Sequence, residues 1–408
     1  MTSRRGQASA SDPPSEPMGD PTTSGRSRRA GLRGGEARTL LRHDVVHSDG
    51  RQFHLYGSVD PSTVAAIADA PADTGYDVTH LHRRFDRLTG TWVLVSPARN
   101  VRPSATTSGD SAPACPLCPG GPELPGPYEL AVFDNRFPSL APAAPASPDA
   151  GELIAASGGR CQVVVYTSEH VSDLADLSLD QVAGVVAVWR ERTAALWADG
   201  HRYVMAFENH GNEVGATLPH LHGQIYAFDH LPPAIVGKLE AHREHRRTNG
   251  SCLGCTLVHE DTASGRVIHE NAHFVAAVPF APRWPYEVQI RAKAHGVGRL
   301  GDLDDDAVAG LVAAVADVVA RYDNLWGFEL PYLMAVQEAP AGDDGDWHLH
   351  VELLPPHRSE SRLKVRASVE TALGAFINDT LPEDTAAALS DVSGRAGTIV
   401  IPTIAAAR

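Results

Sequence analysis

The chain has 408 residues, a formal net charge of −15 and 43% hydrophobic residues, a composition typical of a globular protein with a substantial core. No stretch approaches the roughly 18–20 apolar residues that a membrane span needs, and no signal-peptide pattern opens the chain. The acidic balance argues against non-specific nucleic-acid binding, which depends on a positive surface, but it allows a small anionic substrate.

Composition divides the chain into four parts. Residues 1–37 are rich in Ser, Gly, Pro and Arg, so we expect a disordered tail, with order beginning near Thr39. The remainder is predicted to comprise a first half, 38–232, a second half, 233–390, and a C-terminal tail, 391–408.

The two halves repeat one order of features: a CxxC pair, a histidine, a helix and an H-x-H strand. The helix sequences align without gaps, DLSLDQVAGVVA at 176–187 against DLDDDAVAGLVA at 302–313, and Ser178 with Gln181 predicts a capping box in the first. We expect an α+β fold, a duplicated unit of mostly antiparallel sheet with helices packed on it. A parallel doubly wound fold is disfavoured because helices are too few. Strands are expected at 91–95, 162–167, 202–207, 287–291 and 332–337.

The chain is organised around the stretch His220-Leu221-His222-Gly223-Gln224. On a strand, the two imidazoles and the amide at alternate positions would point to one face. Just upstream, the glycine-bearing run 211–215 could bring backbone N–H groups close to an anion. Alternating imidazoles can bind a metal, attack phosphorus, or divide the two tasks.

Cysteine spacing predicts two metal sites. Without a secretion signal, CxxC pairs indicate metal ligands or redox centres before structural disulfides, and they favour the reducing cytosol as the compartment. Two thiolates and two imidazoles suit tetrahedral zinc. A redox or buried cysteine pair with unrelated histidines is the alternative. The first predicted site is Cys115, Cys118, His170 and His220, and the second, predicted from the internal symmetry, is Cys252, Cys255, His295 and His348.

If a metal holds His220, then His222 can act as a nucleophile toward phosphorus, provided that a backbone carbonyl or similar acceptor fixes its tautomer. The Gln224 amide can hydrogen-bond a phosphoryl oxygen, but it cannot act as a general acid or base. This pair favours transfer to an incoming phosphate over transfer to water. A third metal ligand and an ordinary surface histidine are the other interpretations of His222.

The ordered motifs CPLC, VFDNRFP, YTSEH, FENHG, PHLHGQIYA and HLHVELLPP resemble those of the galactose-1-phosphate uridylyltransferase family of the histidine-triad superfamily. The resemblance implies a ping-pong reaction in galactose metabolism. A histidine attacks the α-phosphorus of UDP-glucose, glucose 1-phosphate leaves, and galactose 1-phosphate takes the uridylyl group. It also implies a homodimer whose active sites are shared between subunits, and no organic cofactor.

By motif position the resemblance makes His222 the nucleophile and Gln224 the group that stabilises the uridylyl intermediate. Some members carry an iron site with histidines where this chain has Gln337 and Glu352, and only His350 remains in register. An iron site is therefore not expected here. The positions that match substrate-contacting residues are Arg99, Arg102, Asn135, Asn209, Thr217, Lys364 and Glu370.

Two other functions fit parts of the pattern. A nucleotide-sugar or dinucleotide phosphorylase or hydrolase would use the same His222 chemistry, but Gln224 in place of a third histidine disfavours hydrolysis, and Lys364 with Glu370 favours a sugar-phosphate acceptor. A non-catalytic, zinc-stabilised nucleotide-binding module would leave His222 idle.

Overall fold

The computed structural model describes residues 38–72, 76–101, 115–142, 144 and 151–407. Twelve of the described strands form one sheet. The predicted N-terminal tail and Arg102 lie outside these residues. In chain order the strands are β1 (Thr39–Val46), β2 (Gln52–Tyr56), β5 (Leu130–Asp134), β7 (Gly159–Val165), β8 (Tyr203–His210), β9 (His222–Phe228), β10 (Val267–Glu270), β11 (Phe274–Ala277), β12 (Val288–Ala292), β13 (Tyr332–Gln337), β14 (His350–Leu354) and β17 (Thr403–Ala406).

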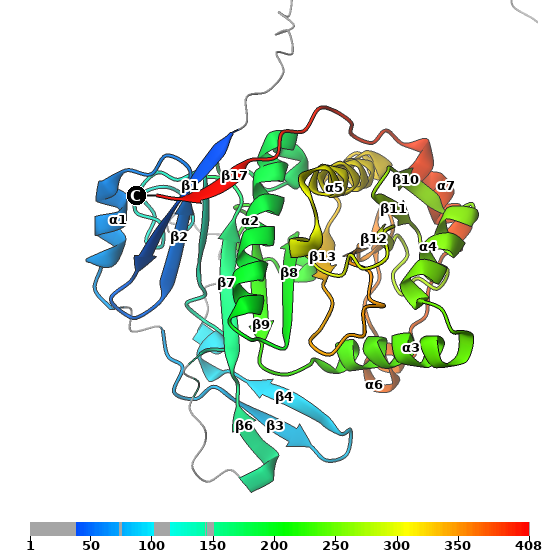
Figure 1. Ribbon diagram of the computed structural model, residues 1–408, viewed down its shortest axis with the longest axis horizontal. Coiled ribbons are helices and arrows are strands. Elements are labelled where there is room, and N and C mark those ends of the chain that lie inside the picture. Colours follow the sequence, from blue (N-terminus) through cyan, green and yellow to red (C-terminus); the bar gives the residue numbers. More distant parts are fainter. Residues whose placement is uncertain (1–37, 73–75, 102–114, 143, 145–150, 408) are drawn as a thin grey trace, which may run out of the picture. The chain divides into compact units, whose positions relative to one another are not determined.

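The order of the strands across the sheet is symmetrical about its centre (Figure 1). The sheet runs β10-β11-β12-β14-β13-β8-β9-β7-β5-β2-β1-β17, so β13, β14 and β12 on one side correspond to β8, β9 and β7 on the other. The two halves join where β8 pairs antiparallel with β13, with Asn209 opposite Leu333. This arrangement confirms the predicted duplicated α+β unit and shows that both units share one sheet.

The aligned helix sequences form α2 (Leu179–Ala198) and α5 (Asp305–Trp326), which contact each other and cover one face of the sheet (Figure 1). The capping box of Ser178 and Gln181 is confirmed. Helix α5 ends at Gly327, which adopts φ +76°. The other helices are α1 (Pro61–Ala68), α3 (Pro233–Asn249), α4 (Leu253–Ala263), α6 (Ser368–Leu373) and α7 (Pro382–Asp391).

The four strands expected in the main sheet are β7, β8, β12 and β13, with ends shifted by up to three residues, and 332–337 is matched without a shift. The strand expected at 91–95 is β4 (Thr91–Val95) of a separate sheet ordered β4-β3-β6, with β3 (His82–Asp86) and β6 (Ile154–Ala156). A third sheet pairs β15 (His357–Ser359) with β16 (Arg362–Leu363). Within the described part of the chain, a helix with the length and hydropathy of a membrane span is not found.

The expectation that both H-x-H motifs lie wholly on strands is wrong at their first histidines. β9 begins at His222 and β14 at His350, so His220 and His348 lie in the preceding turns. In the first half, the backbone N–H of Leu221 donates to the Val171 carbonyl in the loop after β7, 2.8 Å away. The alternation of side chains along a strand therefore applies to His222 and Gln224. The direction of the His220 side chain is set instead by the loop in which it lies.

The C-terminal segment 391–408, expected as a tail, returns to the sheet. β17 pairs parallel with β1, with Thr403 opposite Thr39, at the edge of the first half. A four-residue strand whose partner lies more than 350 residues away in the chain leaves no local sequence pattern, so the sequence did not reveal it.

Two equivalent glycines allow a test of the helix packing. A Cβ on Gly184 in α2 would meet its nearest neighbour, Leu130 Cδ1, at an ordinary 3.6 Å, whereas a Cβ on Gly310 in α5 would lie 3.2 Å from Asn271 Oδ1 and His273 Cβ. We therefore expect Gly184→Ala to raise the free energy of unfolding by about 0.5–1 kcal/mol, because alanine lowers the entropy cost of helix formation. Urea denaturation would measure this change.

Gly310→Ala is the matched control. Its helix-propensity gain is the same, but the tighter contact should cancel part or all of it. Equal stabilisation of both variants, or a loss in Gly184→Ala, would contradict this account of the packing.

Candidate active site and metal centres

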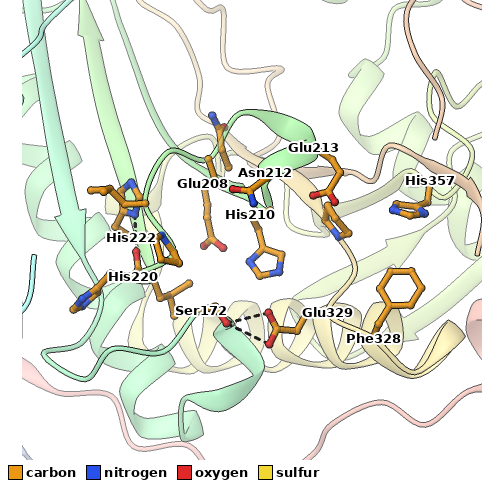
Figure 2. Close-up of a pocket in the computed structure, with 17 residues that line it drawn as sticks. Ser172, Glu208, His210, Asn212, Glu213, His220, His222, Phe328, Glu329 and His357 are labelled. Carbon is orange, nitrogen blue, oxygen red and sulfur yellow. Dashed lines mark hydrogen bonds between the residues drawn. The ribbon is translucent and has the colours of Figure 1, made fainter. Parts of the chain in front are cut away.

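His222 is the first residue of β9 and is half-buried. Its Nδ1 lies 2.7 Å from the backbone carbonyl of His220, so Nδ1–H donates to that oxygen and the ring lone pair is on Nε2. His222 lines three cavities, the largest of about 330 Å³, shown in Figure 2. The predicted requirement for a backbone carbonyl that fixes the tautomer is thus met by the residue two positions earlier.

Gly223, between the two proposed catalytic side chains, permits a close approach of neighbouring strands. A Cβ at this position would lie 2.1 Å from the Tyr166 hydroxyl and 2.8 Å from the Phe207 carbonyl oxygen. Both distances are shorter than any tolerable contact, so glycine is needed here for β9 to fit between β7 and β8. The positions of His222 and Gln224 depend on that fit.

Gln224 and Asn135 lie side by side in the wall of another of the three cavities that His222 lines, called here the second cavity. The Asn135 Nδ2–H donates to Gln224 Oε1 at 3.4 Å, while Asn135 Oδ1 accepts the Phe137 N–H at 2.8 Å. With Oε1 engaged, the Gln224 NH₂ is the group that can donate to an anion. Thr217 and His222 line the same cavity.

The third cavity brings together most of the predicted substrate-contacting residues of the first half. Arg99 lies on a short 3-10 helix, Pro97–Val101, and its Nη1 donates to the Phe137 carbonyl at 3.1 Å and to the Tyr226 hydroxyl at 3.4 Å. Tyr226 was not singled out by sequence reasoning, although the alternation of 222 and 224 continues to it. Burial raises the pKa of Tyr226, so its phenol stays protonated. The predicted residues that line this cavity are Arg99, Asn209, Thr217, His222 and Gln224.

The first Cys₂His₂ set is assembled as predicted, with all four ligand atoms within 4.8 Å of one another: Cys115, Cys118, His170 and His220. Cys118 Sγ lies 3.2 Å from His170 Nδ1 and 3.5 Å from His220 Nδ1, and Cys115 Sγ lies 3.6 Å from His220 Nδ1. A tetrahedral ion at ordinary zinc distances requires S···N separations of about 3.6 Å, so this group could hold a metal.

Two features favour metal binding by this group. His220 Nε2 lies 2.9 Å from the Thr167 carbonyl, which fixes Nδ1 as the ligand atom. Burial opposes ionisation of the Cys115 thiol, but hydrogen bonds from His220 and from the backbone of Leu117 and Cys118 outweigh it and lower its pKa to about 6. A thiolate is the form that binds a metal.

The second set, Cys252, Cys255, His295 and His348, is also assembled within 4.8 Å. Cys255 Sγ lies 3.6 Å from His295 Nδ1 and 3.4 Å from His348 Nε2, and His348 Nδ1 lies 2.8 Å from the Ala292 carbonyl. The cysteines differ in setting from the first pair. Cys252 caps α4, so this CxxC opens a helix, whereas Cys115 and Cys118 flank a turn.

The positions that the resemblance associates with an iron site surround a lysine. Lys238 Nζ, on α3, lies 2.6 Å from Glu352 Oε1 and 3.2 Å from His350 Nε2. The Gln337 amide donates to the other oxygen of Glu352 at 3.1 Å. Burial lowers the pKa of His350 well below its usual value, so its imidazole is a neutral acceptor. The ammonium supplies the positive charge that a metal ion would otherwise bring.

Lys364 and Glu370 are not among the described residues that line the three cavities of the same chain. They form a short ion pair of 2.7 Å, with Lys364 just after β16 and Glu370 on α6. Of the predicted substrate-contacting residues, these two are not brought to His222 within one chain.

Comparisons with known proteins place the chain in a family. The sequence model of the galactose-1-phosphate uridyl transferase N-terminal domain matches residues 72–232, and that of the C-terminal domain matches residues 238–396. The galactose-1-phosphate uridylyltransferase of Thermotoga maritima is 40% identical over 318 residues, covering 76% of this chain and 97% of that protein.

Solved structures agree. A structure described as that of uridylyltransferase superposes with a TM-score of 0.68 and 33% identity, covering 76% of this chain and 97% of its own. An ADP-glucose phosphorylase from Arabidopsis thaliana, with bound ADP-glucose, gives a TM-score of 0.59 at 24% identity, with 76% and 99% covered, and shares the fold. Together with the matches to both domains, these likenesses show that the chain belongs to the galactose-1-phosphate uridylyltransferase family.

Proposed function

We propose that this uridylyltransferase carries UMP from UDP-glucose to galactose 1-phosphate through a covalent uridylyl-histidine on His222, in the Leloir pathway of galactose metabolism. The observation that carries the proposal is the 2.7 Å contact of His222 Nδ1 with the His220 carbonyl, in a ring that also lines three cavities. A carbonyl acceptor on Nδ1 favours the tautomer whose Nε2 is nucleophilic.

In the first step, Nε2 of His222 attacks the α-phosphorus of UDP-glucose. An N–P bond forms and the P–O bond to glucose 1-phosphate breaks. The imidazole becomes positively charged, and the His220 carbonyl stabilises that charge through the Nδ1–H. In the second step, a phosphate oxygen of galactose 1-phosphate attacks the same phosphorus and the N–P bond breaks. Both leaving groups are good enough to need no general acid, which fits an amide at position 224.

Gln224 is proposed to donate its NH₂ to a nonbridging oxygen of the uridylyl group, with Asn135 holding its carbonyl. Arg99 and Thr217 line the same side of the site and are proposed to contact the phosphates. Arg102, outside the described residues, is proposed for the same role by its motif position.

We propose that both Cys₂His₂ groups bind zinc, since their ligand types and spacings match a closed tetrahedral site. Four protein ligands leave no open position, so bound zinc would stabilise the fold around His220 and His348. We propose that the protein works in the reducing cytoplasm, because cysteine pairs that act as metal ligands are typical of a reducing compartment.

We also propose a homodimer in which Lys364 and Glu370 of each subunit complete the site of the other. Their absence from the described lining of the three His222 cavities supports this, and so does the apolar surface around them. Val365, Leu373 and Ile377 are 77%, 76% and 55% exposed, a local density of apolar side chains that water disfavours.

The covalent intermediate can be tested by intact-mass measurement. After the protein is mixed with UDP-glucose alone and quenched in alkali, its mass should increase by one uridylyl group. The adduct should be absent in His222→Ala and should disappear when galactose 1-phosphate is added. An adduct with ADP-glucose but not UDP-glucose would point to a phosphorylase. If no nucleotide sugar gave an adduct, the non-catalytic nucleotide-binding module would be the better interpretation.

Replacing Gln224 with His should raise hydrolysis of UDP-glucose relative to transfer, because an imidazole can accept a proton from water and an amide cannot. Product analysis by chromatography, with and without galactose 1-phosphate, gives the partition between the two outcomes. Gln224→Asn is the control, since it retains the amide. An unchanged partition in Gln224→His would refute the role given to the amide.

Metal removal should lower the melting temperature by several degrees, because a closed Cys₂His₂ site contributes folding free energy. Elemental analysis before and after chelation would establish that two zinc ions per chain are bound and then lost. Cys118→Ser should reproduce part of the loss without chelation, whereas Cys161→Ser, outside both groups, should keep the full metal content. A melting temperature that stays constant while the metal leaves would rule out this stabilising role.

A further inference from the structure

A third group of metal-ligand side chains lies beside the His222 site. Asp173, His210 and Glu329 place their ligand atoms within 4.8 Å of one another. Asp173 follows β7, His210 ends β8, and Glu329 follows α5, so the group joins segments from both halves. Figure 2 shows His210 and Glu329 projecting into the cavity that His222 also lines.

The surroundings of this group are rich in carboxyl groups. Asp323 contacts Asp173 carboxyl to carboxyl, and Asp173 itself is almost fully buried, with its Oδ2 3.8 Å from His210 Nε2. Glu329 is exposed and accepts a hydrogen bond from the Ser172 hydroxyl at 3.0 Å. Among the described residues that line the cavity, lysine and arginine are missing. Histidines are therefore the basic side chains that the described lining of this cavity offers to these carboxyl groups.

Glu208 gives an independent indication of a ligand. It lines the same cavity at 1% exposure, and its Oε1 accepts the Tyr332 hydroxyl at 3.0 Å. Its Oε2 makes no hydrogen bond of normal length and angle to any described residue, although the Tyr166 hydroxyl lies close to the carboxyl group. Figure 2 shows the Glu208 carboxylate beside the His210 ring. An unpaired carboxylate oxygen at such burial is costly unless a cation or a proton satisfies it.

We propose that Asp173, His210 and Glu329 form a binding site for a divalent cation of the Mn²⁺ class, with the carboxyl groups of Glu208 and Asp323 next to it. Two carboxylates and one imidazole are harder ligands than those of the Cys₂His₂ groups, and they favour Mn²⁺ over the soft metals that thiolates select. Remaining positions on the ion would be filled by water from the cavity.

The site would act on the loop that borders His222. His210 is followed directly by Gly211, which has φ +92°, and the turn that it opens leads to Thr217 and His222. An ion held by His210, Asp173 and Glu329 would fix the start of this turn against the loop after α5. Cation binding in this cavity does not depend on the proposed transfer reaction, so the two can fail separately.

The probe is Mn²⁺ added to the purified full-length protein without substrate, and the readout is the electron paramagnetic resonance signal of free Mn²⁺, which falls on binding. Wild-type protein should bind one Mn²⁺ per chain, in addition to any metal already held by the two Cys₂His₂ groups. Glu329→Gln should weaken binding by roughly tenfold or more, because loss of even an outer-shell partner commonly costs that much. Glu329 is exposed, so this variant should keep its fold.

Glu213→Gln is the matched control: Glu213 is an exposed carboxylate on the same cavity but outside the group, so its replacement should leave Mn²⁺ affinity unchanged. Asp173→Asn should weaken binding as Glu329→Gln does. The proposal is overturned if wild-type protein binds no Mn²⁺ at millimolar concentrations, which would mean that protons neutralise the carboxylates. Equal affinity in Glu329→Gln and Glu213→Gln would overturn it too, because binding would then reflect general attraction to an acidic surface.

Discussion

The site depends on one residue that serves two neighbours at once. The imidazole of His220 faces Cys115 and Cys118, and its backbone carbonyl accepts the Nδ1–H of His222. Its remaining ring nitrogen is held by the Thr167 carbonyl. A shift of the His220 backbone would therefore disturb both the cysteine group and the acceptor that sets the tautomer of His222. The ring tautomer of His222 and the course of the chain into β9 thus depend on the same residue that completes the first Cys₂His₂ group.

The second half repeats this contact between a histidine ring and the carbonyl two residues earlier, but in different surroundings. His348 belongs to the second Cys₂His₂ group, and its carbonyl lies 2.9 Å from His350 Nδ1, as in the first half. His350 Nε2, however, meets the Lys238 ammonium at 3.2 Å in a buried setting. The same backbone arrangement thus presents an imidazole to a cavity in one half and to a cation in the other. The two histidines therefore differ in their surroundings, and not in the H-x-H motif.

Features written in short stretches of sequence were predictable. The repeated helices, the Ser178 cap and the two Cys₂His₂ groups follow from local spacing and from the matching order of the halves, and the resemblance supplied the roles of His222 and Gln224. Features that depend on distant pairing were not predictable. The start of β9 at His222 is set by backbone contacts across the sheet, β17 has a partner at the opposite end of the chain, and the Lys238–Glu352 ion pair joins residues over 100 positions apart. Tyr226 lay between these cases, since its alternation with Gln224 was visible but its contact with Arg99 was not.

The pairing of β8 with β13 at the centre of the sheet covers an edge that each half would otherwise expose. A single half folded alone would expose the edge of β8, an eight-residue strand whose N–H and C=O groups would need another strand. The simplest source of that strand is a second copy of the same half, related by a twofold axis, which would place β8 against its own counterpart. In the present chain β13 takes the place of that second β8, so the two paired strands differ in sequence. Within one chain the two halves need not be identical, and they differ at this motif: His222 lines three cavities, whereas His350 belongs to a buried ion network.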